Sequence, residues 1–203
     1  MRFIIKGNEP QEFRDWKNLE NDDWTPTYGE LNNPVKASVF TSLLKEQGHL
    51  CCYCERTLAN KDYHLEHLNP QANHDGDDLD YNNFLCSCLN KTAKGAPLHC
   101  GKKKANSVLP VTPLQPGCNE NFTFNAIGEI GAINEEGYET IRILGLDLKK
   151  LNALREAALE PFLSDDLTDE ELVTFLTEYI REQEVMNPFI SAIKYVFNRY
   201  IPE

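Results

Sequence analysis

Two cysteines near the middle of the chain have the spacing of a zinc-binding turn. In Cys51-Cys52-Tyr53-Cys54, two residues separate Cys51 from Cys54. This spacing lets a tight turn present both sulfurs to one tetrahedral ion. Cys52 and Cys54 are separated by one residue, and in an extended chain their sulfurs would be badly angled. We therefore predict that Cys51 and Cys54 bind zinc.

A second group of thiols follows further along the chain. Cys86-Ser87-Cys88 lacks the two-residue spacing, so these residues alone predict that either Cys86 or Cys88 binds zinc together with Cys100. The seven cysteines are an odd number and most lie in one window. In a reducing compartment, clustered cysteines indicate metal ligands sooner than disulfides. We expect one structural Zn²⁺.

An acid–histidine pair, Glu66-His67, lies between the two thiol groups and shortly before Pro70. A histidine titrates near neutrality, so His67 is a candidate general base. Glu66 would bind a hard divalent cation, Mg²⁺ or Mn²⁺, through oxygen. Together they predict metal-dependent cleavage of a phosphodiester. Because adjacent strand residues face opposite ways, the pair is expected at a strand end or irregularity.

This pattern resembles the HNH nucleases, a zinc-containing branch of the ββα-metal (His-Me finger) endonucleases. Within that family the chain looks most like the HNH subunit of the Septu anti-phage system, which is also found as a retron effector. The resemblance covers roughly residues 1 to 150, and the residues that carry it are Phe3-Ile4-Ile5-Lys6-Gly7, Leu43-Leu44-Lys45-Glu46-Gln47, Glu66-His67, Tyr81-Asn82-Asn83 and His99-Cys100-Gly101.

The resemblance also implies roles for further residues. It places Cys88 and Cys100 in the second zinc pair, and it makes Asn83 the amide that orients the base histidine. In the family a second ligand of the catalytic metal follows the last zinc cysteine, where this chain has Gly101, which offers no donor. His99 is one candidate replacement. His64 is the other, because it would share a strand face with Glu66.

The implied function is that of an endonuclease effector in an anti-phage complex. The family resemblance implies an ABC/SMC-like ATPase partner and, in retron versions, a reverse transcriptase with its RNA–DNA hybrid. DNA is the favoured substrate. RNA or tRNA remains an alternative, because no residue in the sequence indicates whether the 2′-hydroxyl is recognised. The rival interpretation is a zinc-stapled adaptor or nucleic-acid-binding module that does not cut.

The charge of the chain is unevenly distributed. A net charge of −12 opposes unaided binding to nucleic acid, which normally needs a basic surface. Lysines nevertheless crowd the second half of the motif, and Lys102, Lys103 and Lys104 are predicted to contact phosphate. Acidic residues dominate 165–184, a plausible docking surface for a partner. We infer that another subunit helps to deliver the substrate.

The composition is that of a globular protein. The chain has 203 residues and 41% hydrophobic content, enough for one core with appended helices. The apolar run at Phe3-Ile4-Ile5 is too short for a signal peptide, and no run approaches the length of a membrane span. A soluble, cytoplasmic protein is expected.

The predicted fold class is α+β, with a zinc-stapled ββα-metal core flanked by helices. We divide the chain into an N-terminal segment (1–48), an HNH core (49–115) and a C-terminal lobe (116–203) that docks a partner. The elements expected are a strand at 3–6, helices at 10–19 and from Asn33-Pro34 to Gly48, a turn at 73–78, a hairpin formed by 122–124 and 130–132, and helices starting at Asp147, at the Thr168/Glu171 capping box and at Asn187-Pro188.

Overall fold

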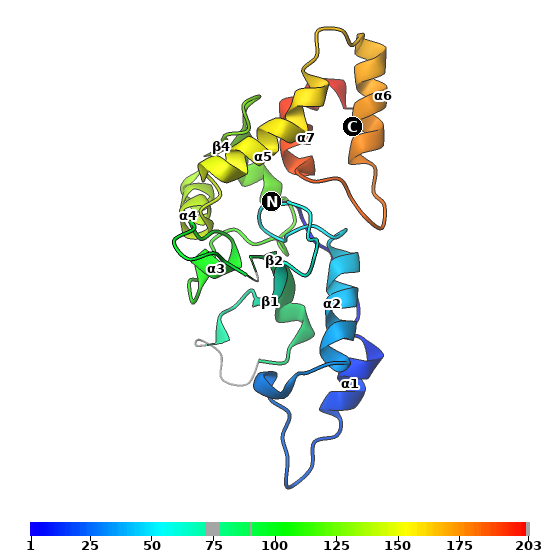
Figure 1. The fold of residues 1–203 in the computed structure, drawn as a ribbon, viewed down its shortest axis with the longest axis vertical. Helices are drawn as coiled ribbons and strands as arrows, with labels where there is room; N and C mark the ends of the chain where they lie inside the picture. The colour runs from blue at the N-terminus through cyan, green and yellow to red at the C-terminus, as the bar shows by residue number, and fades with distance from the viewer. Residues whose placement is uncertain (72–77, 90, 202–203) are drawn as a thin grey trace.

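The computed structural model describes residues 1–71, 78–89 and 91–201. It is an elongated molecule of mixed α+β class, as predicted, with helices at both ends and short strands in the middle (Figure 1). The described residues form two separate two-stranded antiparallel sheets. Of the predicted turn at 73–78, Asp78 is described, and 73–77 lie outside the described residues.

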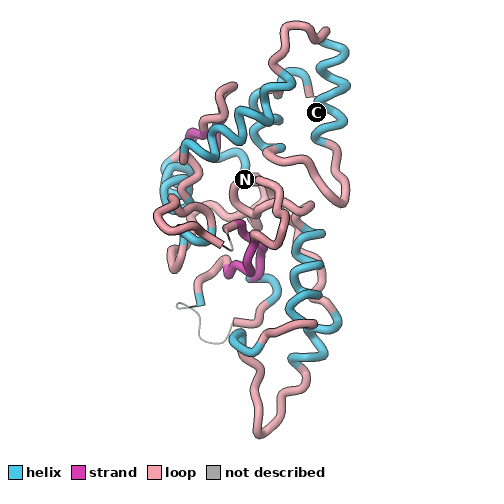
Figure 2. Tube along the Cα trace, viewed as in Figure 1, coloured by secondary structure: helices cyan, strands magenta, loops and turns pink. Residues whose placement is uncertain are grey.

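The central sheet carries the acid–histidine pair. Strand β1 (Tyr63–His67) runs antiparallel to β2 (Phe84–Cys88), and in their register Glu66 lies opposite Leu85 and His67 lies opposite Phe84. All five residues of β2 are buried, whereas on β1 Glu66 is buried and His67 is half-buried; the two strands lie near the middle of the molecule (Figure 2). The short helix α3 (Gly101–Lys104) follows. The order is therefore strand, strand, helix.

Two helices precede this sheet. Helix α1 (Gln11–Lys17) packs on α2 (Val35–Glu46), and α2 packs on β2. The predicted start of α2 is displaced by one residue, because Pro34 is the cap rather than the first helical residue. The predicted end is confirmed, since Gly48 has a φ of +60°, which disfavours other residues.

The strand predicted at 3–6 is not formed. Ile4 donates one backbone hydrogen bond, of 2.8 Å, to Pro113 O, and 3–6 belong to no ladder. The residues are apolar enough for a strand, but no strand among the described residues pairs with their backbone. The segment is extended and packs against the core.

The C-terminal part begins with the predicted hairpin. Strands β3 (Phe122–Phe124) and β4 (Ile130–Ala132) pair antiparallel with Thr123 opposite Gly131, which confirms the prediction. Helix α4 (Glu135–Leu144) was not predicted. Its cap is Asn134, whose side chain accepts a 2.8 Å hydrogen bond from Gly137 N.

Three further helices complete the chain. Helix α5 (Lys149–Leu159) starts after Leu148, so Asp147 is not its cap. Helix α6 (Asp169–Ile180) has the predicted capping box of Thr168 and Glu171. Helix α7 (Ile190–Val196) starts after Phe189, which has a φ of +58°, rather than at Pro188.

The buried apolar residues form one large cluster and a smaller one. The larger runs from Met1 to Leu151 and includes the buried cysteines, and the smaller runs from Leu159 to Phe197 between α5, α6 and α7. Leu50, Met186 and Ile190 pack together where the two parts meet. Within the described ranges, no helix combines the length and the apolar character that a membrane crossing requires.

Candidate functional site: a thiol cluster beside a buried carboxylate

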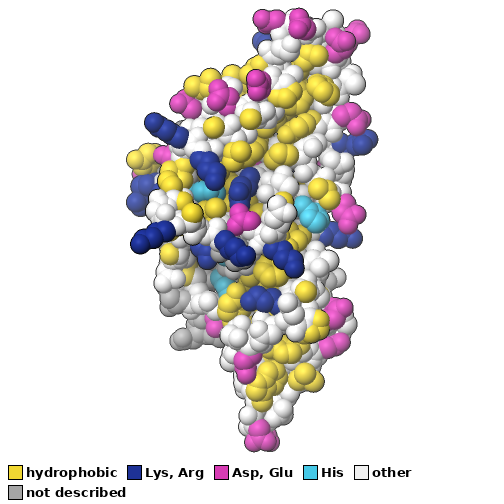
Figure 3. Space-filling model, in the orientation of Figure 1, with side chains coloured by type: hydrophobic (Ala, Val, Ile, Leu, Met, Phe, Trp, Pro, Cys, Tyr) yellow, Lys and Arg dark blue, Asp and Glu magenta, His cyan; other side chains and the backbone are white. Residues whose placement is uncertain are grey.

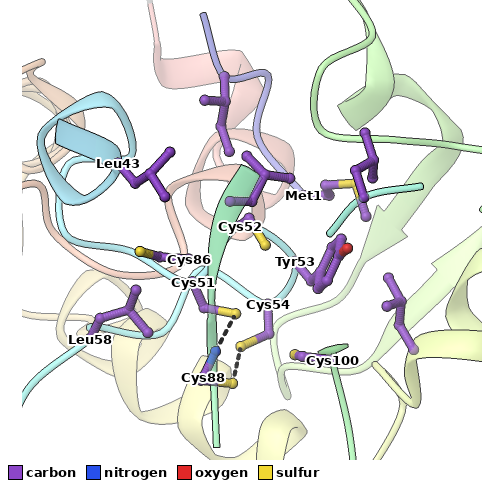
Figure 4. Packing of buried hydrophobic residues seen from close by; sticks show 14 of the residues in the cluster. Met1, Leu43, Cys51, Cys52, Tyr53, Cys54, Leu58, Cys86, Cys88 and Cys100 are labelled. Carbon is purple, nitrogen blue, oxygen red and sulfur yellow. Dashed lines mark hydrogen bonds between the residues drawn. The ribbon is translucent and has the colours of Figure 1, made fainter. Parts of the chain in front are cut away.

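Four cysteine sulfurs gather at the centre of the larger core. The sulfurs of Cys51, Cys54, Cys88 and Cys100 all lie within 4.8 Å of one another (Figure 4). Zinc–sulfur bonds of about 2.3 Å in a tetrahedron place the sulfurs about 3.8 Å apart. The Cys54 and Cys88 sulfurs are 3.8 Å apart. The donor set and its spacing therefore fit a structural zinc ion.

Three different local structures hold these sulfurs. Cys51 and Cys54 lie in the tight turn after Leu50, closed by a 3.1 Å bond from Glu55 N to Cys51 O. Cys88 ends β2. Cys100 precedes α3 with a φ of +54°, and its amide donates to Leu144 O at 2.7 Å. The cluster thus joins the turn, the sheet and the helices.

The remaining thiols lie outside this cluster. The structure selects Cys88 over Cys86 as its third member, and Figure 4 shows Cys86 apart from the four sulfurs. Cys52 is buried but is not part of the group. Cys118 is buried too, and its thiol donates to Met1 O.

His99 belongs to the thiol cluster and not to the carboxylate. Its Nδ1 lies 3.2 Å from Cys100 Sγ and 3.7 Å from Cys88 Sγ. This corrects the expectation that His99 replaces the missing catalytic-metal ligand, because its ring nitrogen faces sulfur. A ring N–H in this place stabilises thiolates that bind a metal.

The thiols have unequal acidity in the folded chain. Burial raises the pKa of Cys100 well above that of a free thiol. Burial also acts on Cys51, but hydrogen bonds from the thiols of Cys100, Cys52 and Cys54 outweigh it and hold the pKa of Cys51 well below the usual value.

Glu66 is a buried carboxylate with three side-chain partners. It is 7% exposed. Its Oε1 accepts a hydrogen bond from Tyr53 OH and forms an ion pair with Lys104 Nζ, each at 3.1 Å, and its Oε2 lies 3.2 Å from His64 Nε2. Burial raises the pKa of Tyr53 well above its usual value, so the phenol remains a donor. Contacts to both of its oxygens therefore fix the orientation of the Glu66 carboxylate.

Gly101 lies against this carboxylate. A Cβ at position 101 would be 2.1 Å from Glu66 Oε2 and 2.8 Å from His64 Nε2. The space in which the resemblance implies a ligand side chain is therefore filled by Glu66 and His64. These two side chains share one face of β1, as their separation of two residues predicted.

His64 and Glu66 can offer one nitrogen and one oxygen to the same cation. Two neighbouring ligands of an octahedral Mg²⁺, each about 2.1 Å from the ion, lie about 3.0 Å apart. The separation of 3.2 Å between His64 Nε2 and Glu66 Oε2 fits this arrangement. His64 Nδ1 is buried and lacks a hydrogen-bond partner among the described residues. Gly101 makes the close approach possible.

His67 lies on the opposite face of β1, between aromatic rings. Its ring centroid is 4.6 Å from Tyr28 and 5.0 Å from Phe84, edge-on to both. Its Nε2 lies 3.1 Å from Asp78 O. A carbonyl only accepts, so Nε2 carries the proton and Nδ1 of the neutral ring keeps a lone pair. Burial lowers the pKa of His67, which favours that neutral form.

The pair lies at a strand end, as expected, but its two side chains do not face one site, which was the reason for that expectation. His67 is the last residue of β1, and the strand is regular up to it. Glu66 and His67 point to opposite faces, and they are connected through Lys104. The Lys104 ammonium contacts the Glu66 carboxylate and also donates to His67 O at 2.9 Å.

Asn83 bonds to the backbone beyond the strand. Its Oδ1 accepts from Asn69 N at 2.7 Å, and its Nδ2 donates to Asn69 O at 3.0 Å. The amide therefore fixes the loop that carries Pro70. The orientation of His67 by Asn83, which the resemblance implies, stays a prediction.

The three predicted phosphate-binding lysines differ in exposure. Lys102 and Lys103 are exposed on α3. Lys104 is 1% exposed, so the expectation that it contacts nucleic acid is wrong. Its ammonium turns inward because the buried carboxylate of Glu66 attracts it. Tyr28, Tyr53 and the inward role of Lys104 were missed, since no local spacing connects them to the motif.

Comparisons with known proteins agree with this chemistry. No protein-family model matches the chain. The chain is 27% identical, over 172 residues, to the protein named "Retron Vc95 putative HNH endonuclease" from Vibrio cholerae serotype O1 biovar El Tor. The alignment covers 77% of this chain and 82% of that protein. The chain is thus similar, as a distant homologue, to a retron protein named as an HNH endonuclease.

Proposed function

We propose that this protein is a metal-dependent endonuclease of the HNH type, with a ββα-metal core formed by β1, β2 and α3. One observation carries the proposal most: His64 and Glu66 form a compact nitrogen–oxygen pair one residue from a histidine whose Nδ1 is free to accept a proton. The distant homology to a protein named as an HNH endonuclease supports the same chemistry.

The roles follow from the contacts. His67 Nδ1 removes a proton from the attacking water, while its Nε2–H is held by Asp78 O. Glu66 and His64 would hold Mg²⁺ or Mn²⁺, which would stabilise negative charge on the scissile phosphate and the departing oxygen. Asn83 fixes the loop after β1, and so keeps His67 at the strand end. The zinc ion supported by the four cysteines maintains the loops.

The substrate is a nucleic acid, with DNA favoured and RNA or tRNA as the alternatives. Basic side chains lie across the middle of the face shown in Figure 3, whereas acidic side chains gather at the two ends of the molecule. The net charge of −12 would weaken binding by the isolated chain. An ATPase partner of the ABC/SMC-like type, joined in a retron by a reverse transcriptase with its RNA–DNA hybrid, is the proposed means of delivery in an anti-phage complex.

A second candidate function has one specific observation in its favour. The Glu66 carboxylate already has a cationic partner in Lys104, so the site is neutralised without a metal. A zinc-stapled adaptor that binds nucleic acid but does not cut would need no more than this. The His64–Glu66 pair argues for the nuclease, because an adaptor has no need of a second ligand beside the carboxylate.

Cleavage by the purified protein, together with its co-purified partners, tests the proposal. Plasmid DNA and total RNA are incubated with Mg²⁺ or Mn²⁺ and with wild type, His67→Ala or Glu66→Gln. We expect metal-dependent cutting by wild type and at least a hundredfold slower cutting by both variants, in keeping with the loss of a general base of about 10²–10⁴. The exposed Glu170→Gln serves as the matched control. Cutting that survives His67→Ala would reject the base.

A further inference from the structure

Lys104 is a fully buried lysine, and it lies within the proposed catalytic site. It is among the largest side chains that are less than 2% exposed. Lysine is almost never buried unless its ammonium is paired, because leaving water penalises the charge strongly. A buried ammonium at this place therefore has a specific partner.

The ammonium contacts both members of the acid–histidine pair. Lys104 Nζ lies 3.1 Å from Glu66 Oε1 and donates to His67 O at 2.9 Å. It binds the carboxylate oxygen that does not face His64, because His64 Nε2 lies at Oε2. Glu66 thus has one oxygen bound by the ammonium and Tyr53 and the other beside His64.

The thiol cluster fixes the place of this lysine. Lys104 is the last residue of α3, and its amide donates to Cys100 O at 2.9 Å. One turn of helix therefore separates a proposed zinc ligand from the ammonium. A lysine side chain is flexible when free, so it can locate a carboxylate only when its backbone is held in this way.

We propose that Lys104 is a positioning residue of the nuclease site, a role that rests on the proposed function. The ammonium occupies Glu66 Oε1 and directs Oε2 alone toward the divalent cation, while it holds the end of β1 at His67. A fixed positive charge beside the metal position also lowers the affinity for the metal. Lys104 therefore weakens metal binding, and it also gives Glu66 and His67 a defined geometry.

Two measurements separate this role from a structural ion pair. Mn²⁺ binding is measured by electron paramagnetic resonance of the free ion, and the cleavage rate is measured at saturating Mn²⁺. The variants are Lys104→Met, which removes the charge and the donors, and Lys104→Gln, which keeps an amide donor. The exposed neighbour Lys102→Met is the matched control for the loss of a positive charge on α3.

We expect both Lys104 variants to bind Mn²⁺ about tenfold or more tightly, because a like charge within a few ångströms is removed. We also expect cleavage at saturating Mn²⁺ to be at least about tenfold slower, because Glu66 and His67 lose their common anchor. Zinc content and circular dichroism check the fold. An unchanged Mn²⁺ affinity, an unchanged rate, or failure of both variants to fold even in the cold would overturn the proposal.

Failure of the proposed function would look different. In that case wild type would either not bind Mn²⁺ or bind it equally well after Glu66→Gln. The behaviour of the Lys104 variants would not change this conclusion. Wild-type binding that depends on Glu66, combined with Lys104 variants that match wild type in affinity and rate, would remove the role of Lys104 alone.

Discussion

The space for a side chain at position 101 is occupied by the carboxylate of Glu66. A Cβ on Gly101 would lie 2.1 Å from Glu66 Oε2, far closer than two such atoms approach. Gly101 therefore does more than lack a metal-ligating side chain. It allows the start of α3 to lie directly against Glu66 and His64 of β1.

Gly101→Ala should consequently damage the metal site. The added methyl group would displace Glu66 Oε2 and His64 Nε2, and a misplacement of about 1 Å costs about a hundredfold in rate. We expect weaker Mn²⁺ binding and at least a tenfold slower cleavage. The control is Gly29→Ala, where a Cβ would meet only Thr27 Oγ1, at 3.9 Å. Equal behaviour of the two variants would contradict the close packing.

Cys86 and Cys88 provide a matched test of the zinc site. Both lie on β2 and both are fully buried, but only Cys88 belongs to the thiol cluster. We expect Cys88→Ala to lose zinc and to melt at a much lower temperature, because metal binding contributes directly to folding. Cys86→Ala should retain zinc, measured by atomic emission, with a loss of about 1 kcal/mol. The reverse pattern would refute the assignment.

The first half of the thiol cluster was predictable because its signal is local. The spacing of Cys51 and Cys54 decides their geometry within one turn, and the capping box of Thr168 and Glu171 acts within four residues. Glycine at position 48 likewise ends its helix through its own φ. These features depend on neighbours in sequence, which the sequence displays directly.

The contacts inside the site could not be predicted, because no local sequence pattern reveals them. The inward turn of Lys104 requires Glu66 to lie beside α3, and Tyr28 reaches His67 from a distant loop. The choice of Cys88 over Cys86 needed the position of Cys100 relative to the sheet. The strand expected at 3–6 failed for the same reason, since pairing depends on a partner elsewhere in the chain.

Lys102 and Lys103 should set part of the salt dependence of nucleic-acid binding. Each exposed ammonium that contacts one phosphate of a duplex contributes about 0.9 to the slope of log affinity against log salt. We expect Lys102→Ala and Lys103→Ala each to lower the slope by about that amount in a Glu66→Gln background, measured with the co-purified complex. Lys194→Ala on α7 is the control, and identical slopes for all three would exclude contact by α3.

The capping box of α6 should contribute measurably to stability. Thr168 Oγ1 accepts from Glu171 N at 3.3 Å and donates to Glu171 Oε2 at 2.7 Å. We expect Thr168→Ala to lower the free energy of unfolding by about 1 kcal/mol in urea titrations. Thr177→Ala, in the exposed middle of α6, should change it by less than about 0.5 kcal/mol. A larger loss at Thr177 would contradict the cap.

Tyr28 should hold the orientation of His67 through its ring and not through its hydroxyl. The two rings meet edge-on with centroids 4.6 Å apart, and Phe84 supports His67 at 5.0 Å. Such an aromatic contact contributes about 0.5–1.5 kcal/mol beyond burial, which corresponds to a loss of up to about tenfold when it is removed.

Tyr28→Leu should therefore slow cleavage by up to about tenfold at saturating Mn²⁺, with unchanged Mn²⁺ affinity, because His64 and Glu66 lie on the other face of β1. Tyr28→Phe keeps the ring and should cleave at nearly the wild-type rate. Comparison of these two variants in single-turnover assays separates the ring from the hydroxyl. An equal loss in both would assign the effect to the phenol, and His67 would then depend on Phe84 and Asp78 O for its orientation.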